Sequence, residues 1–333
     1  MREKTFVTEP RIERLASSWQ RLSLPGRPGL DRAASRLLFL LTLLPPTLAV
    51  VMLVALGARA WPILQTQKAW DLLTGTVWKP LSGAFGFLPF ITGTVWVTGA
   101  AVILAIPPCL LTAIYLSEYA RQSTRAVMKP LLDLLAAIPS VVYGVWGVIL
   151  IVPWVEHYLA PFCDRWLGFL PFLVSTNPTG FSILAGGIVL AVMIAPFIIA
   201  VTYEVMSTVP EGLRQASLAL GATRWQTVRC AVLPQALPGI LAGIVLGSSR
   251  ALGETMAVLM VVGNVAQVPA SVFDAAYPLP ALIANNYGEM MSIPMYDAAL
   301  MGAALVLLII VLVFNVISTL ILRRIMGRVR RAW

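Results

Sequence analysis

Residues 180–203 read GFSILAGGIVLAVMIAPFIIAVTY, a stretch without a single Lys, Arg, Asp or Glu. A helix needs about 20 consecutive apolar residues to cross the hydrocarbon core of a bilayer. Pro196 is compatible with such a helix, because neighbouring helices and water can satisfy the carbonyl groups that a proline leaves free. The stretch therefore predicts a membrane-spanning helix.

Other apolar runs of similar length bring the number of candidate spans to six. They cover about 36–58, 90–117, 127–152, 180–203, 237–262 and 297–322. Only 12% of the residues are charged and the mean hydropathy is +0.84, whereas a soluble domain has about 25% charged residues. We therefore predict an all-α membrane protein. A transmembrane domain, 36–325, lies between a basic N-terminal segment, 1–35, which could include a short surface helix, and a basic tail, 326–333.

The basic residues predict the orientation of these spans. Of the 24 Lys and Arg residues, 19 lie before the first span, in the loops after spans two and four, or after the last span. Four lie in the remaining loops, and Arg250 lies inside span five. Loops rich in Lys and Arg stay in the cytoplasm, so both termini are expected to be cytoplasmic. Trp61, Trp154 and Trp166 then lie at outer span ends, where interfacial tryptophan collects.

Several kinds of chemistry are not supported by the sequence. The cysteines, Cys109, Cys163 and Cys230, are not at CxxC spacing, and there is one histidine, His157. These features predict neither a metal site nor a disulfide framework. The basic residues flank apolar runs instead of forming a face on a folded domain, which argues against nucleic acid. None of the four lysines follows a glycine, as the lysine of a P-loop does, and no nucleophile–base pair stands out, so the chain is not expected to be an enzyme.

The loop over 204–234 has the pattern of a helix, a turn and a second helix. From Glu211 to Pro234 it reads EGLRQASLALGATRWQTVRCAVLP. Pro210 and Glu211 suit a helix N-terminus, and Gly221 suits its C-terminal end. A second short helix is expected from Thr223 to an end at Leu233-Pro234. The first helix would project into the cytoplasm, in a form that suits a groove on another protein.

Span five carries a glycine seam and two charges. Gly239, Gly243 and Gly247 recur at four-residue steps, which lets another helix approach closely. Arg250 and Glu254 continue this seam, so we expect both on the same helical face, where they can pair. Charges at bilayer depth cost about 2.5–3.5 kcal/mol each and persist where they pair or line a polar path. A guanidinium suits an oxyanion, although an ion pair between helices without substrate contact is the alternative interpretation.

Four parts of the chain resemble known transporter families. Gln215-Ala216-Ser217, Gly221 and Val232-Leu233-Pro234 resemble the EAA loop of bacterial ABC importer permeases, with Gln and Ser where Glu and the second Ala are usual. The stretch 249–258, SRALGETMAV, is similar to the Arg-Ala-x-Gly-Glu-Thr motif of phosphate importer permeases, and its Met-Ala-Val continuation resembles the PstC-type subunit more than its PstA-type partner. YLSEYA at 115–120 and IPSVVYG at 138–144 also resemble segments of that family.

This resemblance implies a permease of the type I ABC importer kind in the bacterial cytoplasmic membrane. Its implied partners are a PstA-type permease, two ATP-binding subunits and an extracytoplasmic phosphate-binding protein, with ATP and Mg²⁺ on the ATP-binding subunits and no cofactor on this chain. The implied ATPase-docking residues are Glu211, Gln215, Ala216, Ser217 and Gly221. The candidate residues of the substrate path are Arg250, Glu254, Ser140 and Tyr143.

Alternatives remain at this point. Another oxyanion, such as molybdate or sulfate, could be the substrate, and a secondary transporter or channel without an ATPase is a further possibility. A kink with polar packing is the simpler interpretation of Pro139, Ser140 and Tyr143. Glu118 and Asp133, which lie near predicted span ends, are interpreted as interfacial residues.

Overall fold

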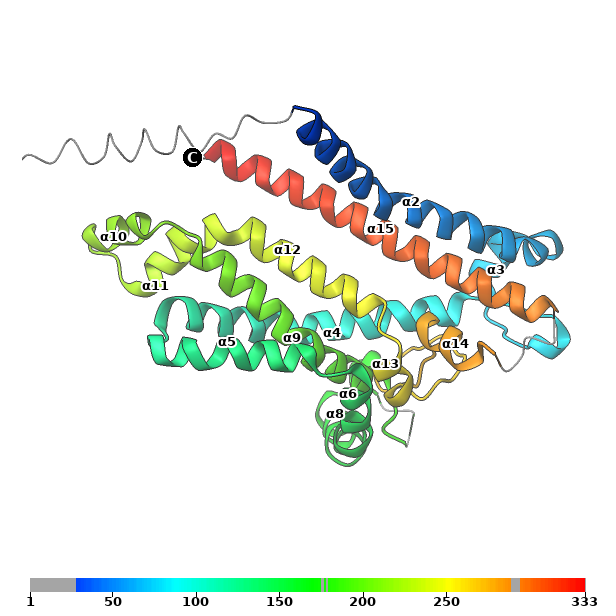
Figure 1. Ribbon diagram of the computed structural model, residues 1–333. Coiled ribbons are helices and arrows are strands. Elements are labelled where there is room, and N and C mark those ends of the chain that lie inside the picture. Colours follow the sequence, from blue (N-terminus) through cyan, green and yellow to red (C-terminus); the bar gives the residue numbers. More distant parts are fainter. Residues whose placement is uncertain (1–27, 175–176, 178, 289–293, 333) are drawn as a thin grey trace, which may run out of the picture. The chain divides into compact units, whose positions relative to one another are not determined.

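The computed structural model describes residues 28–332 apart from 175–176, 178 and 289–293, and this part of the chain is built from helices (Figure 1). The surface helix predicted in the N-terminal segment lies mostly outside these residues. The chain divides into two units, Met1–Ala55 and Leu56–Trp333. The described part of the first unit is the beginning of α2 (Pro28–Thr66), whose large apolar side chains are exposed. Such a helix is suited to contact with lipid.

Six helices in the described residues are long and apolar enough to cross a membrane, which confirms the predicted number. They extend over Arg32–Thr66, Leu88–Tyr119, Ser140–Leu167, Ile183–Ser207, Arg224–Leu252 and Met295–Gly327. The last of these belongs to α15 (Pro294–Ala332), which continues as a helix through most of the predicted tail.

The third span begins later than predicted. Residues 127–152 do not form one helix: α5 (Gln122–Ala137) ends first, and α6 (Ser140–Trp146) starts the helical segment that runs to Leu167 in α8 (Ala160–Leu167). Ile138 has an extended backbone (φ −62°, ψ 130°), because a residue before proline is pushed out of the helical region. An apolar window cannot detect this break, since both sides of it are hydrophobic. Figure 1 shows the segment from α6 to α8 turning away from α5.

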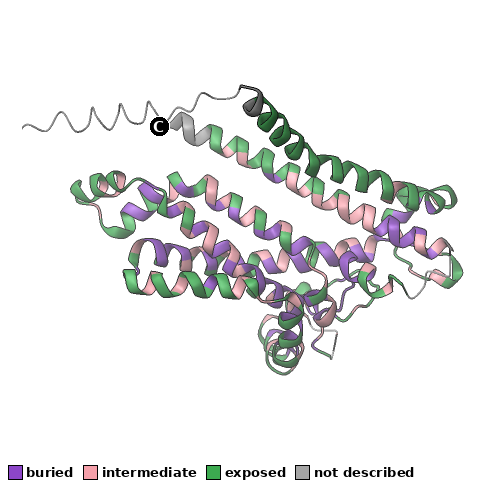
Figure 2. Ribbon diagram, viewed as in Figure 1, coloured by how far each residue is buried: buried purple, intermediate pink, exposed green. Residues whose placement is uncertain are grey.

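The core of the second unit lies where α4 (Leu88–Ile114), α9 (Ile183–Ser207) and α12 (Leu233–Leu252) pack together. Figure 2 shows the buried residues gathered along these three helices. Small residues allow the close approach: a Cβ added to Gly187 of α9 would lie 2.8 Å from the Cβ of Ala100 in α4. Because lipid is as apolar as leucine, such packing, and not the removal of apolar surface from water, holds membrane helices together.

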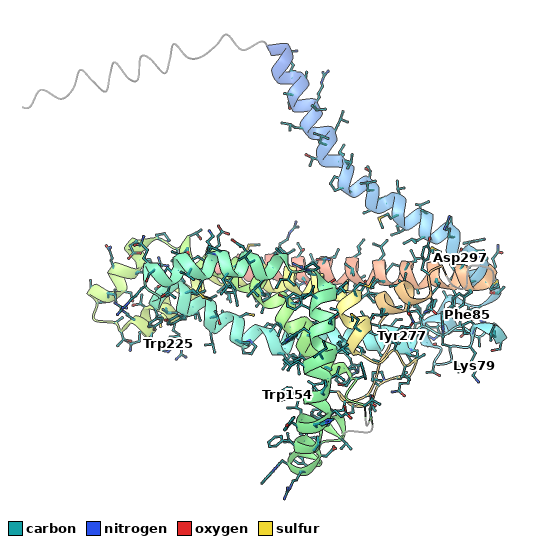
Figure 3. All side chains as sticks on the ribbon, turned by 60° about the horizontal axis from the view of Figure 1, so that its bottom comes forward. Lys79, Phe85, Trp154, Trp225, Tyr277 and Asp297 are labelled. Carbon is teal, nitrogen blue, oxygen red and sulfur yellow. The ribbon has the colours of Figure 1, made fainter. Side chains whose placement is uncertain are left out.

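The two ends of this unit differ in character. At one end, Trp78 packs edge-on against Phe85 and Phe90, with ring centroids 5.4 and 4.9 Å apart. Asp297 and Tyr277 lie near this end as well, whereas Trp225 lies at the opposite end (Figure 3). The end with Trp225 carries α10 (Glu211–Ala219) and α11 (Arg224–Thr227), and it is the predicted cytoplasmic end.

Candidate functional site

Two interrupted helical segments meet at the centre of the candidate site. The first interruption separates α5 from α6, and the second separates α12 from α13 (Met256–Val261). Helix α6 packs against α13 at a glycine: a Cβ on Gly144 would lie 2.7 Å from the sulfur of Met260 and 3.2 Å from the Cα of Ala257. Interrupted membrane helices expose backbone groups and charges only where protein or a water-filled cavity surrounds them. The two interruptions thus mark the place in this chain best suited to a polar substrate.

Arg250 lies in the last turn of α12. A cation is stabilised there by the negative end of the helix dipole. The side chain is exposed in this single chain, and its charge acts on the hydroxyl of Tyr143 in α6. The structure therefore brings Arg250 and Tyr143 together from helices that are distant in the sequence.

Glu254 lies in the interruption itself, and this corrects the expectation of a continuous span over 237–262. Helix α12 ends at Leu252, so Arg250 and Glu254 do not share one helical face. The ion pairs found in the described part of the chain do not include one between them. Instead, Oε1 of Glu254 accepts a long hydrogen bond, 3.4 Å, from the backbone N–H of Ala257 in the first turn of α13. A carboxylate at that position is stabilised by the positive end of a helix.

The glycine seam packs against another helix, as predicted. A Cβ on Gly239 or Gly243 would lie 2.4 or 2.9 Å from Val205 or Val201 of α9. Gly247 approaches Ile198 of the same helix. The seam therefore faces the chain's own α9, whereas the exposed Arg250 lies at its margin and is available to something outside this chain.

Tyr143 and Ser140 both belong to α6, and Tyr143 forms a hydrogen bond across the first interruption. The hydroxyl of Tyr143 donates a hydrogen bond of 2.9 Å to the carbonyl oxygen of Leu135, in the last turn of α5. The same carbonyl oxygen accepts the backbone N–H of Ile138 at 3.3 Å, so Tyr143 adds a second bond at this helix end. Ser140 is half-buried at the first position of α6. Tyr143 thus ties the two sides of the first interruption together.

The predicted turn of the loop over 204–234 is present. Helix α10 begins after Pro210, and Gly221 follows its end with φ +85°, a left-handed conformation that suits glycine. Thr223 and Gln226 form a capping box at the start of α11. Two of these expectations need refinement: Glu204 still belongs to α9, and the second helix does not end at Leu233-Pro234 but continues into α12. The π-helical turn Val228–Val232 precedes the proline, and its wider spacing accommodates the missing N–H.

The predicted docking residues of α10 divide into exposed and inward-facing ones. Glu211, Gln215, Ala216 and Gly221 are exposed, beside the exposed apolar side chains of Leu218, Leu220 and Trp225. Ser217 is half-buried, and its hydroxyl lies 3.0 Å from that of Thr227 in α11. Ser217 thus fastens α10 to α11.

An ion pair that was not predicted joins this loop to the second span. Two nitrogens of Arg214 in α10 donate to the two carboxylate oxygens of Glu118, at 3.1 and 3.0 Å. Both side chains are largely buried, with 14% and 11% exposed. The interfacial interpretation of Glu118 missed this contact, since the residues are 96 positions apart. The costly placement of a carboxylate at a span end was the one available signal.

Comparison with known proteins places these features in context. The family described as "Binding-protein-dependent transport system inner membrane component" matches residues 109–331. "Phosphate transport system permease protein PstC" of Pasteurella multocida is 38% identical over 74% of this chain and 78% of its own length. The protein of the same name from Xylella fastidiosa is 35% identical over 91% of this chain and 95% of its own length.

Solved structures of ABC importers share the fold. The MetNI methionine ABC transporter in an inward-facing conformation gives a TM-score of 0.52 at 21% identity, over 75% of this chain and 99% of that chain. A bacterial ABC transporter involved in the import of the acidic polysaccharide alginate gives 0.54 at 19% identity, over 89% and 98%. At these identities the likeness concerns the fold alone, which is that of type I ABC importer permeases.

Proposed function

Because the chain belongs to the binding-protein-dependent transport system inner membrane components, we propose that it is a permease subunit that carries inorganic phosphate across the bacterial inner membrane. The observation that carries this proposal is the exposed Arg250, in the last turn of α12 directly before the interruption between α12 and α13. The names of the relatives support phosphate as the substrate.

The proposed chemistry at the site is the recognition of an oxyanion. The guanidinium of Arg250 keeps its charge and offers several donors in a fixed fork, which suits two oxygens of phosphate. Glu254 can accept a hydrogen bond from a protonated phosphate oxygen, and a sulfate dianion lacks that proton. Tyr143 and Ser140 belong to α6, which follows the other interruption and packs against α13. No bond of the substrate is made or broken, so the chain acts as a path and not as an enzyme.

The energy is proposed to come from partner subunits. The exposed surface of α10 and its neighbouring turn would dock on an ATP-binding subunit that holds ATP and Mg²⁺. A second, PstA-type permease would face the exposed side of Arg250, a second ATP-binding subunit would dock on that permease, and an extracytoplasmic phosphate-binding protein would deliver the substrate. ATP binding and hydrolysis would then alternate the access of the site between the two sides.

The test is phosphate uptake into proteoliposomes that contain the whole transporter, its binding protein and ATP inside. Arg250→Ala should lower uptake by about 10- to 100-fold, the range expected for a lost contact to a charged group, while the complex still assembles. Arg165→Ala, which removes an exposed arginine of α8, is the matched control and should transport normally. Normal uptake by Arg250→Ala would demote Arg250 to a structural residue.

Competition identifies the substrate. Excess unlabelled phosphate should abolish uptake of labelled phosphate, whereas molybdate and sulfate should not. Effective competition by either anion would assign the chain to that oxyanion. Uptake without any ATP-binding subunit would point instead to a secondary transporter or channel.

A further inference from the structure

We propose that a connected set of four side chains transmits the position of α10 to α5, and through α5 to the site around Tyr143. The set consists of Arg214, Glu118, Ser117 and Arg125. The inference rests on the proposed function, and it assigns these residues a positioning role: none of them reaches the interruption where the substrate would bind.

Arg214 is the first member. It forms ion pairs with Glu118 and, at 3.6 Å, with the exposed Glu211 of its own helix, and it is hydrogen-bonded to backbone oxygens at the end of α9. Besides its two hydrogen bonds to Glu118, Nη1 donates to the carbonyl oxygen of Val209 at 2.5 Å and Nη2 to that of Met206 at 2.8 Å. A guanidinium holds several partners at once in one rigid geometry. The base of α10 is thereby fixed both to the end of α9 and to the end of the second span.

Glu118 and Ser117 link Arg214 to the beginning of α5. Glu118 lies in the π-helical turn Tyr115–Tyr119 that ends the second span, and the hydroxyl of Ser117 donates to Oε1 of Glu118 at 3.0 Å. The carbonyl oxygen of Ser117 accepts a hydrogen bond of 2.6 Å from Nη2 of Arg125, which belongs to the first turn of α5. Polar contacts therefore run without a gap from α10 to α5.

The beginning of α5 has room to move. A cavity of about 80 Å³ lies between α5, α9 and the π-helical turn, with Arg125, Lys129 and Glu204 among its lining residues. Among the residues that the structure describes, Nε of Arg125 is buried without a hydrogen-bond partner. A buried donor without a partner is costly, so the present position of Arg125 does not satisfy all of its donors.

The far end of α5 touches the site. Helix α5 has 16 residues and is therefore about 24 Å long. Near its C-terminal end, the carbonyl oxygen of Leu135 accepts the hydrogen bond from Tyr143 of α6, the helix that packs against α13 at Gly144. Pro130 removes one hydrogen bond inside α5, but the helix continues through it to Ala137, so we expect a displacement of its first turn to reach Tyr143.

This arrangement predicts uncoupling when the connection is cut. The test uses the whole transporter with its binding protein in proteoliposomes, and it measures ATP hydrolysis and uptake of inorganic phosphate in the same preparation. Glu118→Gln, Arg214→Gln and Arg125→Gln should each keep the ATP-binding subunits bound and ATP hydrolysis running. Phosphate moved per ATP should fall by about tenfold, the effect of losing one contact to a charged group. Arg121→Gln, an exposed arginine just before α5, is the matched control and should leave the ratio unchanged.

The double variant Glu118→Gln/Arg214→Gln sharpens the result. If both residues act through one connection, the double variant should move as much phosphate per ATP as each single variant does. If they act independently, the two losses should multiply. An unchanged ratio in Arg125→Gln would overturn the inference, since this residue lies away from the docking surface. So would loss of the ATP-binding subunits in the Arg214 variants together with a normal ratio in Arg125→Gln, because Arg214 would then serve docking alone. A wild-type transporter without phosphate-driven hydrolysis would instead refute the proposed function.

Discussion

Two arginine–glutamate combinations in the described part of the chain behave in opposite ways. Arg250 and Glu254 are four positions apart and do not pair, because α12 ends between them. Arg214 and Glu118 are 96 positions apart and form a bidentate pair at 3.0–3.1 Å. Proximity in sequence is thus a poor guide to pairing where a helix is interrupted, and a folded helical bundle can join charges that the sequence gives no reason to associate.

The difference suits the two proposed roles. A charged side chain that recognises a substrate needs hydrogen-bonding groups that are free to contact it. The helix termini at the interruption stabilise the charges of Arg250 and Glu254 and leave such groups free. In a buried contact between helices, most hydrogen-bond donors and acceptors need partners, because each one without a partner costs free energy. Four predictions test this contrast, in order of decreasing effect.

The largest effect is on stability. Arg214→Gln or Glu118→Gln should lower the free energy of unfolding by about 2–4 kcal/mol, because each variant breaks a largely buried ion pair and only the exposed Glu211, at 3.6 Å, remains as a further partner of Arg214. Arg250→Gln should change it by less than about 0.5 kcal/mol, as an exposed substitution does. Thermal unfolding of the purified complex measures both. Equal losses in the two regions would end the distinction.

The turn after α10 gives the next effect. Gly221 has φ +85°, and nothing lies within 4 Å of an added Cβ, so Gly221→Ala isolates the backbone conformation. The variant should lose about 1–2 kcal/mol, the cost of a left-handed residue with a side chain, and should bind the ATP-binding subunit more weakly. Gly212→Ala, in an equally open helical position, is the control, and an equal loss there would remove the conformational explanation.

A change at the interruption in span five should alter stability less than the two changes above, and it should also lower transport. A Cβ on Gly253 meets only the carbonyl oxygen of Arg250, at 3.9 Å, so there is space for alanine. Gly253→Ala favours a continuous helix by about 1 kcal/mol, which would bring Arg250 and Glu254 onto one face. Uptake should fall about fivefold. Gly57→Ala, another open helical position, should transport normally, and unchanged uptake in Gly253→Ala would show that the interruption does not depend on the glycine.

The smallest effect concerns the fastening of α10 to α11. Ser217→Ala and Thr227→Val each remove the hydroxyl contact of 3.0 Å, and each should cost about 1 kcal/mol. The double variant should cost little more than either single one. Additive losses in thermal unfolding would show that the two hydroxyls act separately.

The sequence determined the class of the protein and the number of its spans. Long apolar runs have one stable environment, and their length matches the bilayer, so the number of spans follows from the apolar runs of the sequence. The seam of Gly239, Gly243 and Gly247 and the turn at Gly221 were equally predictable, because a residue without a side chain has few other reasons to recur at such positions.

Only the tertiary structure decided where helices are interrupted and which charges meet. Both sides of the Ile138–Pro139 and Gly253–Thr255 interruptions are apolar or helix-compatible, so hydropathy runs across them. Pro234, in contrast, ends no helix, because the π-helical turn before it absorbs the strain. The pairing of Glu118 with Arg214 required α4, α9 and α10 to be packed together. The hydropathy of a segment reflects the solvent around it, and it can be read from the sequence. Which charged side chains pair depends on which distant segments of the chain pack against each other in the fold.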